Sequence, residues 1–402
     1  MSLLWYSGFE WQSITAGVEW SNSFGTPAIS TAIKNTGSAS LRVQTPTIFT
    51  PKGMSHVWSG SDANVIYAQF YMRIDMSVDV ETSCFALYDA SGGRMSVSLH
   101  LTADDKIGLW YNDTATQVGS NSSALSKNTQ YRIEVKLDRS GAGGTHVLEA
   151  RIDGAAAFAS TSSATVSWGA NQVGVGLELN GDGAAAGDVY FDDLVLRNDA
   201  YPGGERVVIS VPTGSGDSAA TTGNASMVNE VPPSNTATSG STMAELDSNG
   251  VTASYNMTDS STLGIDSYDT ISAVMPLCRI REESAGTSSY RHGIKSASGG
   301  TTTLTTAADG GNTTVRTCPN GTTAFGRMLI SETDPTTGVA WTPTGTNSID
   351  NMQQVVANVD ADSTPDLWVL TMGTMILYKD GVAPGGSVVK DVIGIGILPF
   401  AR

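Results

Sequence analysis

The chain has 402 residues, of which 40% are hydrophobic and only 15% are charged, the composition of a folded protein and not of a disordered one. Its formal net charge of −17 and its lack of any Lys/Arg cluster argue against binding of nucleic acid. The 44 glycines, the many Ser and Thr residues and the scarcity of Lys or Glu runs predict an all-β fold, and the length predicts two domains.

The amino-terminal segment Met1–Tyr6 has no basic residues, hydrophobic run or small-residue cleavage site of a secretory signal. No run of 18 apolar residues occurs, so no membrane contact is expected. Of the three cysteines, Cys84 lies in an apolar run and is expected in a core. For Cys278 and Cys318, a disulfide and two separate thiols both stay open.

Residues 1–198 contain successive strand patterns separated by polar turns, at the spacing of about ten residues that is typical of antiparallel sandwiches and jelly rolls. The turn Asp104–Lys106 is expected to join two of these strands as a hairpin. The predicted strands are Ser40–Val43, Val65–Ile74, Met95–Leu101, Ile107–Tyr111, Tyr131–Leu137, Leu148–Ile152 and Val173–Leu179.

The stretch Asp188–Asn198 (DVYFDDLVLRN) is apolar on both faces and predicts a central strand that is covered on both sides. Simple alternation places Asp193 on the face of Phe191, and Asp192 on the face of Leu194. A buried carboxylate without a partner is too costly to keep. At least one of these two aspartates therefore needs a cation, an arginine or several backbone N–H groups.

The order of G-F-E near the start, S-L-R-V, Y-R-I-E-V-K-L-D, R-I-D-G, V-G-V-G-L and Y-F-D-D-L-V-L resembles the concanavalin-A-like lectin/glucanase jelly roll over about the first 200 residues. The resemblance implies that the first and last strands are adjacent and that a structural calcium is held by Glu10 and Asp193, with Asp192 less certain. Calcium prefers such oxygen ligands. The alternative is an aspartate bonded to backbone N–H groups and to Arg42 or Arg132.

Glucanase members of that superfamily carry an E-x-D-x-E-type run, which this chain lacks. The nearest segment is Glu134–Asp138, with two acids four residues apart, so the protein is not expected to be an enzyme. Four aromatic residues are candidates for stacking on a sugar, although each is also suited to a core or an interface. They are Trp58, Trp110, Tyr111 and Trp168.

After a predicted linker at 199–206, a second domain is expected over 207–402, as a β-sandwich. Its central strand should be the apolar segment Leu367–Tyr378, and Asn347–Val359 should form a short helical turn before a strand. The apolar segment Val388–Phe400 must be buried in this domain, in a second copy of the chain or in the rest of a particle, and the low charge of the chain then favours a homo-oligomer. Further predicted strands are Val207–Val211, Ser267–Glu282, Tyr290–Ser296, Thr301–Thr306 and Gly326–Glu332.

The second half resembles a module of tailed-bacteriophage virion proteins. The residues that carry this resemblance are Met227–Pro233 and Glu332–Thr342, followed at a suitable distance by the strand Asp366–Tyr378. The resemblance implies a non-catalytic virion structural protein, such as a capsid decoration, head fibre or tail accessory protein, assembled in the bacterial host cytoplasm with other virion proteins. Its lectin-like domain would face outward, toward a host cell-surface glycan. The alternative is a secreted carbohydrate-binding or carbohydrate-cleaving protein.

Overall fold

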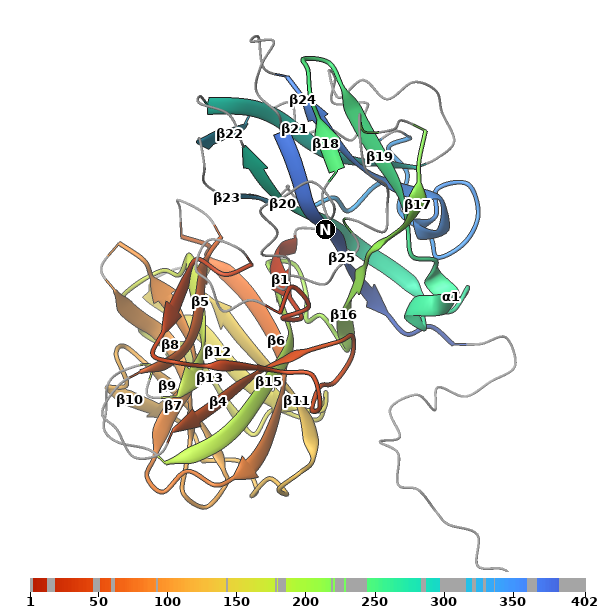
Figure 1. The fold of residues 1–402 in the computed structure, drawn as a ribbon. Coiled ribbons are helices and arrows are strands. Elements are labelled where there is room, and N and C mark those ends of the chain that lie inside the picture. The colour runs from red at the N-terminus through yellow and green to blue at the C-terminus, as the bar shows by residue number, and fades with distance from the viewer. Residues whose placement is uncertain are drawn as a thin grey trace, which may run out of the picture.

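The structure is a computed structural model, and it confirms the all-β prediction with four antiparallel sheets packed as two sandwiches (Figure 1). It describes residues 3–12, 19–45, 51–58, 62–91, 93–141, 144–177, 179, 186–217, 220, 228, 244–282, 287–296, 316–319, 323–327, 330–335, 337–359 and 367–382.

The first sandwich pairs an eight-stranded sheet with a seven-stranded sheet. The eight-stranded sheet has the order β13 (Ala159–Ala164), β12 (His146–Ile152), β11 (Gln130–Asp138), β6 (Val65–Met76), β15 (Gly187–Arg197), β4 (Ser40–Thr45) and β3 (Ala28–Ser30), with β1 (Leu3–Ser7) also paired to β15. The seven-stranded sheet has the order β10 (Thr116–Val118), β9 (Ile107–Tyr111), β8 (Arg94–Leu101), β7 (Thr82–Asp89), β14 (Gln172–Leu177), β5 (Lys52–Val57) and β2 (Asn22–Phe24).

Several predictions for this half are confirmed. The first strand β1 pairs with the last strand β15, and β8 and β9 form the expected hairpin. Alternate residues of each strand point into one apolar core between the sheets, where Phe70 and Phe85 stack with ring centroids 5.0 Å apart. Cys84 is buried in the same core.

The second sandwich pairs two five-stranded sheets in the described part of the chain. One has the order β16 (Glu205–Ser210), β25 (Leu367–Lys379), β20 (Thr270–Glu282) and β23 (Thr323–Arg327), with β18 (Ala244–Leu246) also paired to β25. The other has the order β17 (Pro212–Ser215), β19 (Thr252–Met257), β24 (Met352–Asn358), β21 (Thr287–Ser296) and β22 (Arg316–Pro319). The short helices α1 (Ser260–Leu263) and η4 (Ile349–Asn351) complete it.

The strand β25 has partners on both sides and is the central strand that its apolar sequence predicted. The helical turn η4 before β24 is also confirmed. Within the segment 332–342, the N–H of Gly338 donates a hydrogen bond to the carbonyl of Asp334, and Trp341 beyond it is buried in the core. No helix among the described residues is long and apolar enough to cross a membrane.

Several predictions fall wholly or partly on residues that the structure does not describe, including the predicted strand 326–332 and the segment 227–233. The segment 388–400, whose burial implied a homo-oligomer, and the strand 301–306 lie outside the described residues. Cys278 is buried between the sheets of the second sandwich, but the side chain of Cys318 is not described. Whether these two cysteines pair therefore stays a prediction.

The strand β15 is buried along its whole length, as expected, but its predicted alternation holds only as far as Asp192. A β-bulge at Asp193, where φ is +44°, adds one residue and shifts the register against β6 between Asp192 and Val195. Leu194 therefore follows Phe191 into the core, whereas Val195 faces the second sandwich. The predicted facing of Asp193 was wrong because alternation assumes a regular strand.

The two sandwiches are joined by an apolar cluster to which both contribute. Tyr6 and Trp11 of the first sandwich pack with Val207, Ile209 and Met375 of the second. The Tyr6 hydroxyl also donates a hydrogen bond of 2.8 Å to the carbonyl of Met375. Figure 1 shows β1 and β16 between the two sandwiches. Since all these side chains are nearly or fully buried, a fragment ending at residue 198 would expose an apolar surface.

The segment predicted as a linker, 199–206, is packed against the first sandwich. The Tyr201 ring lies edge-on to Tyr67 with centroids 4.9 Å apart, and the Arg151 guanidinium lies 4.4 Å from the Tyr201 centroid. Nη1 of Arg197 lies 2.8 Å from Oε1 of Glu205, and this buried ion pair links the end of β15 to the start of β16. These contacts restrain the connection at both ends.

We expect Trp11→Ala to lower the free energy of unfolding by about 3–5 kcal/mol, because Trp11 is fully buried and its removal leaves a cavity. The cavity lies between the sandwiches, so the two halves should also begin to unfold in separate transitions. Urea titration followed by tryptophan fluorescence and circular dichroism measures both effects. Trp168→Ala, at a partly exposed site, is the control. If the Trp11→Ala variant were as stable as the wild type, Trp11 would not stabilise the contact between the two sandwiches.

Candidate functional site

The outer face of the seven-stranded sheet carries a row of small residues that ends in larger polar and aromatic ones. In register across the strands lie Ser55, Gly174, Ala86, Ser98, Trp110 and Gln117. Their neighbours along each strand point into the core, so this row faces away from it. Tyr88, Met95 and Leu179 cover the middle of the face. The end formed by β8, β9 and β10 lies beyond that apolar cover.

At that end, His100 lies between a carboxylate and a hydroxyl. Its Nδ1 is 3.2 Å from Oε1 of Glu81, and its Nε2 is 3.2 Å from Oγ of Ser98. The ring also stacks on Trp110, with centroids 5.2 Å apart. Burial lowers the pKa of His100 to about 4, so the imidazole is neutral at pH 7. It therefore orients its neighbours without adding charge.

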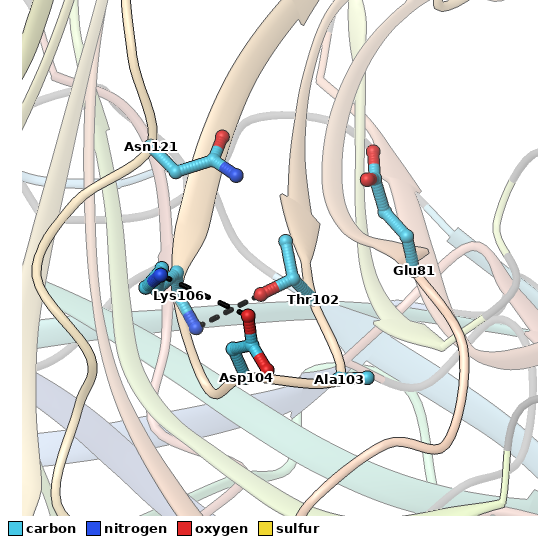
Figure 2. Close-up of a pocket in the computed structure, with 6 residues that line it drawn as sticks. All are labelled: Glu81, Thr102, Ala103, Asp104, Lys106 and Asn121. Atoms are coloured by element: carbon cyan, nitrogen blue, oxygen red, sulfur yellow. Dashed lines mark hydrogen bonds and ion pairs between the residues drawn. The ribbon is translucent and has the colours of Figure 1, made fainter.

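A pocket of about 350 Å³ opens beside His100, where the turn of the β8–β9 hairpin meets the following loop. Figure 2 shows Asn121 and Glu81 on opposite sides of it, with the hairpin residues between them. Lys106 donates its backbone N–H to Thr102 Oγ1 at 3.1 Å, and its ammonium lies 3.8 Å from Asp104. The lining residues are Glu81, Thr102, Ala103, Asp104, Lys106 and Asn121.

Gly108 leaves room for Asn121 and Trp110 beside β9. A Cβ atom at residue 108 would lie 2.6 Å from Oδ1 of Asn121, which would have to move, and in a tight contact of 3.2 Å with Nε1 of Trp110. Asn121 Oδ1 accepts a hydrogen bond of 2.5 Å from Gln117 Nε2. The indole N–H of Trp110 has no partner among the described residues. Amides, a hydroxyl, carboxylates and an aromatic ring are therefore gathered at one place.

None of the four aromatic candidates lines this pocket, but Trp110 lies beside its lining residue Asn121, since both approach Gly108. Tyr111 follows it in β9 and packs on the core at the other face, as does Trp58. Trp168 lies under the guanidinium of Arg94, 5.5 Å from the ring centroid. The structure does not bring the four together, because neighbouring residues of a strand point to opposite faces.

The two acids of the segment Glu134–Asp138 lie on the eight-stranded sheet, away from the pocket. Glu134 is 2% exposed and lies 3.7 Å from Arg132, and Asp138 lies 3.2 Å from Lys136. Both carboxylates form ion pairs with basic residues of their own strand, as charged residues with a structural role do.

The predicted metal ligand Glu10 is fully buried. Its Oε2 accepts hydrogen bonds of 2.7 Å from both the backbone N–H and the hydroxyl of Ser38. Burial raises its pKa to about 8, and the nearby carboxylates of Asp193 and Glu19 add to that rise. The loop that carries Ser38 thus wraps a carboxyl group that is costly to ionise.

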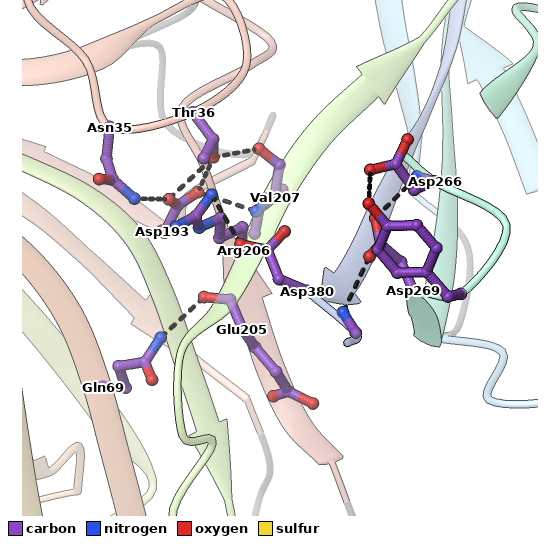
Figure 3. Close-up of polar contacts among 12 residues, drawn as sticks. Asn35, Thr36, Gln69, Asp193, Glu205, Arg206, Val207, Asp266, Asp269 and Asp380 are labelled. Carbon is purple, nitrogen blue, oxygen red and sulfur yellow. Dashed lines mark hydrogen bonds and ion pairs between the residues drawn. The ribbon is translucent and has the colours of Figure 1, made fainter. Parts of the chain in front are cut away.

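Asp193 projects from the bulge of β15 toward the same loop and toward β16, as Figure 3 shows. It accepts hydrogen bonds from Asn35 Nδ2 at 2.7 Å, from Thr36 Oγ1 at 2.8 Å and from the N–H of Val207 at 2.8 Å. Burial raises its pKa to about 6. Asp192 accepts from the N–H of Asn35 at 2.6 Å, and burial and Asp193 raise its pKa as well.

Backbone N–H groups therefore serve these aspartates, as one alternative proposed, but the suggested arginines do not bond to them. Arg42 forms a two-pronged ion pair with Asp188, and Arg132 lies beside Glu134. The carboxylates, hydroxyls and amide gathered at this cluster are donors that suit a hard cation such as calcium. Within the described ranges, however, no three acidic, His or Cys side chains are placed around one point. Calcium therefore stays a prediction.

Sequence reasoning missed His100, Glu81 and Asn121. Glu81 and Asn121 lie in loops, and His100 was one of four scattered histidines. One signal was present: His100 and Trp110 alternate with core residues on two strands of a predicted hairpin, and the register that pairs Ser98 with Trp110 makes His100 its diagonal neighbour.

No family model matches the chain, and no curated protein matches it either. Among solved structures, it is similar to the cellulose-induced protein Cip1, with a TM-score of 0.37 and 15% identity over 48% of this chain and 96% of that one.

Two others are the receptor-binding domain of botulinum neurotoxin type G (TM-score 0.34, 11% identity, 49% of this chain and 48% of that one) and the Trypanosoma rangeli sialidase in complex with the inhibitor DANA (0.32, 12%, 48% and 30%). The chain thus spans about half and under a third of those two. At TM-scores below 0.5, these likenesses decide nothing about what this chain binds.

Proposed function

We propose that the protein binds a glycan, through the pocket at the β8–β9 hairpin and the adjacent Trp110. The observation that carries the proposal is the convergence at this one place of hydrogen-bonding side chains and a partly exposed aromatic ring. Sugars present hydroxyl groups at their edges and C–H groups on their faces, and such sites match both. Glu81 and Asn121 supply the polar contacts and Trp110 the stacking surface.

Binding without catalysis is the favoured form of this activity. A glycosidase needs one carboxylic acid with a raised pKa and a second carboxylate at a fixed separation. The carboxylates that line the pocket are Glu81 and Asp104, whose side chains are 44% and 80% exposed. The neutral His100 is held in place by two partners and serves as a positioning group.

For the cluster of Glu10, Asp192 and Asp193, we propose that calcium binds in place of a proton. The three carboxyl groups are buried near one another, neutral donors bond to them, and the Arg206 guanidinium near Asp193 offsets part of their charge. Asp193 also accepts from Val207 of the second sandwich, so an ion there would stabilise the loop and the joint together. A bound cation would balance the negative charge of the ionised carboxyl groups in this buried cluster, and this supports the proposal.

The virion role remains a second proposal, supported by the sequence resemblance at 227–233 and 332–342. The rigid joint between the sandwiches is a feature that a mounted receptor-binding protein needs, and a secreted glycan-binding protein is the competing setting. Partners among virion proteins and a homo-oligomer belong to the same proposal.

We expect Trp110→Ala to weaken binding to the best polysaccharide ligand by about three- to tenfold, since an aromatic stacking contact contributes roughly 0.5–1.5 kcal/mol beyond its buried area. Affinity electrophoresis against a polysaccharide panel identifies the ligand, and calorimetry measures the change. Trp168→Ala, in the loop before β14 and absent from the pocket lining, should bind normally. Product analysis should detect no cleavage of the bound polysaccharide. Equal loss in both variants would contradict this site.

Without a bound cation, the free energy of unfolding should fall as pH rises from 4.5 to about 8. Glu10 has its ordinary pKa of 4.5 in the unfolded chain and about 8 in the folded one, so the folded state binds more protons in that range. Glu10→Gln should flatten this dependence. Added calcium should raise the melting temperature of the wild type at pH 8, but not that of Glu10→Gln. If the wild type melts at the same temperature with calcium and with chelator, the proposal that calcium binds at this cluster is wrong.

If the virion proposal holds, antibody against the full chain should label intact phage particles, and the protein should sediment with them through a density gradient. Recovery only as free protein in the culture medium, in the absence of particles, would favour the secreted alternative. This measurement is independent of whether the pocket binds a glycan.

A further inference from the structure

The charges around the glycan pocket are unevenly distributed, and the next step rests on the proposed glycan binding. Two carboxylates, Glu81 and Asp104, line the pocket together with one ammonium group, that of Lys106. Asp105, in the same turn, adds a further acid whose Oδ2 accepts from the Ser77 hydroxyl. The lining therefore carries an excess of negative charge.

The only cationic side chain in the described pocket lining, Lys106, lies beside an acid. The Lys106 ammonium lies 3.8 Å from Asp104, and the backbone of Lys106 is bonded to Thr102. Among the described residues that line the pocket, no arginine is present. A carboxylated or sulfated sugar is usually held by a guanidinium or a free ammonium, which offers the donors that an anion needs.

His100 adds no positive charge that would compensate. It is 4% exposed, it lies against Trp110, and its two ring nitrogens face Glu81 and Ser98. With Nδ1 donating to Glu81 and Nε2 accepting from Ser98, a neutral ring satisfies both contacts. Glu81, at 44% side-chain exposure, keeps access to the pocket and can accept from a ligand as well.

We propose that the pocket selects glycans without acidic groups and binds amine-bearing sugars more tightly than their neutral counterparts, with Glu81 as the residue that determines this preference. A sugar ammonium would donate to Glu81 in a charge-assisted hydrogen bond, while hydroxyls meet Asn121 and Thr102. The net charge of −17 acts in the same direction, because it repels polyanions at long range.

The test uses the full chain and three glycans with one linkage but different charge: cello-oligosaccharides, glucosamine oligosaccharides and oxidised cellulose, which carries glucuronate. A glycan array with neutral, amine-bearing and acidic members of other backbones extends the comparison. We expect amine-bearing members to bind best and acidic members worst in every backbone that is retained.

Two variants change the pocket charge in opposite directions. Glu81→Gln should weaken binding of the amine-bearing glycan by about threefold, and Lys106→Gln should strengthen it by a similar factor, as expected for partly exposed ion pairs. Neutral glycans should respond less to either change, and high salt should reduce both effects. Glu149→Gln, on the eight-stranded sheet, is the control. A purely structural role would weaken binding in both pocket variants.

The outcomes separate this inference from the one on which it rests. Preference for acidic members overturns the charge selection but leaves glycan binding intact. The expected order with no response to Glu81→Gln or Lys106→Gln also overturns it, because the selection would then arise elsewhere. If the wild-type chain retains no glycan of any charge, the proposed function fails and this inference fails with it.

Discussion

A single extra residue in β15 determines how the two halves of the molecule meet. Because the bulge at Asp193 reverses the alternation, β15 can fill the core of the first sandwich with Phe191 and Leu194 and still turn Val195 toward the second. The same bulge points the Asp193 carboxylate at the N–H of Val207, in the first strand of the next domain. A regular strand would separate these functions, since its side chains would continue on their original faces.

The sheets were predictable from the sequence where apolar residues recur at every second position or form a continuous run. The alternation of Val97, Leu99 and Leu101 was enough to predict β8, although the opposite face with Ser96, Ser98 and His100 is buried as well, and the acidic turn at 104–106 was enough to predict its hairpin. The apolar segment at 367–378 identified β25, because few other segments could be buried on both sides. The spacing of apolar residues along the sequence indicates which residues are buried, and the strands β8 and β25 form because their apolar residues are buried.

What could not be predicted depends on tertiary contacts. No residue type in β15 signals the bulge at Asp193. The Pro/Gly segment 199–206 has the sequence pattern of a free linker, yet Tyr201 packs on Tyr67. The candidate site is a similar case. Glu81 and His100 are 19 residues apart and meet only because β7 and β8 pair in one particular register. Likewise, the four aromatic candidates shared a residue type but no face of the sheet.

The packed connection between β15 and β16 has a mechanical consequence. The candidate site lies on outer strands of the seven-stranded sheet, whereas the joint is formed by β1, β16 and β25. A ligand fixed to a large surface would therefore pull on the first sandwich at a distance from the joint. Since Trp11 and Tyr6 are buried at this joint, rotation of one sandwich against the other would expose their side chains. If the site binds a glycan and the second sandwich is anchored, as proposed, a force on the glycan would act on this apolar joint.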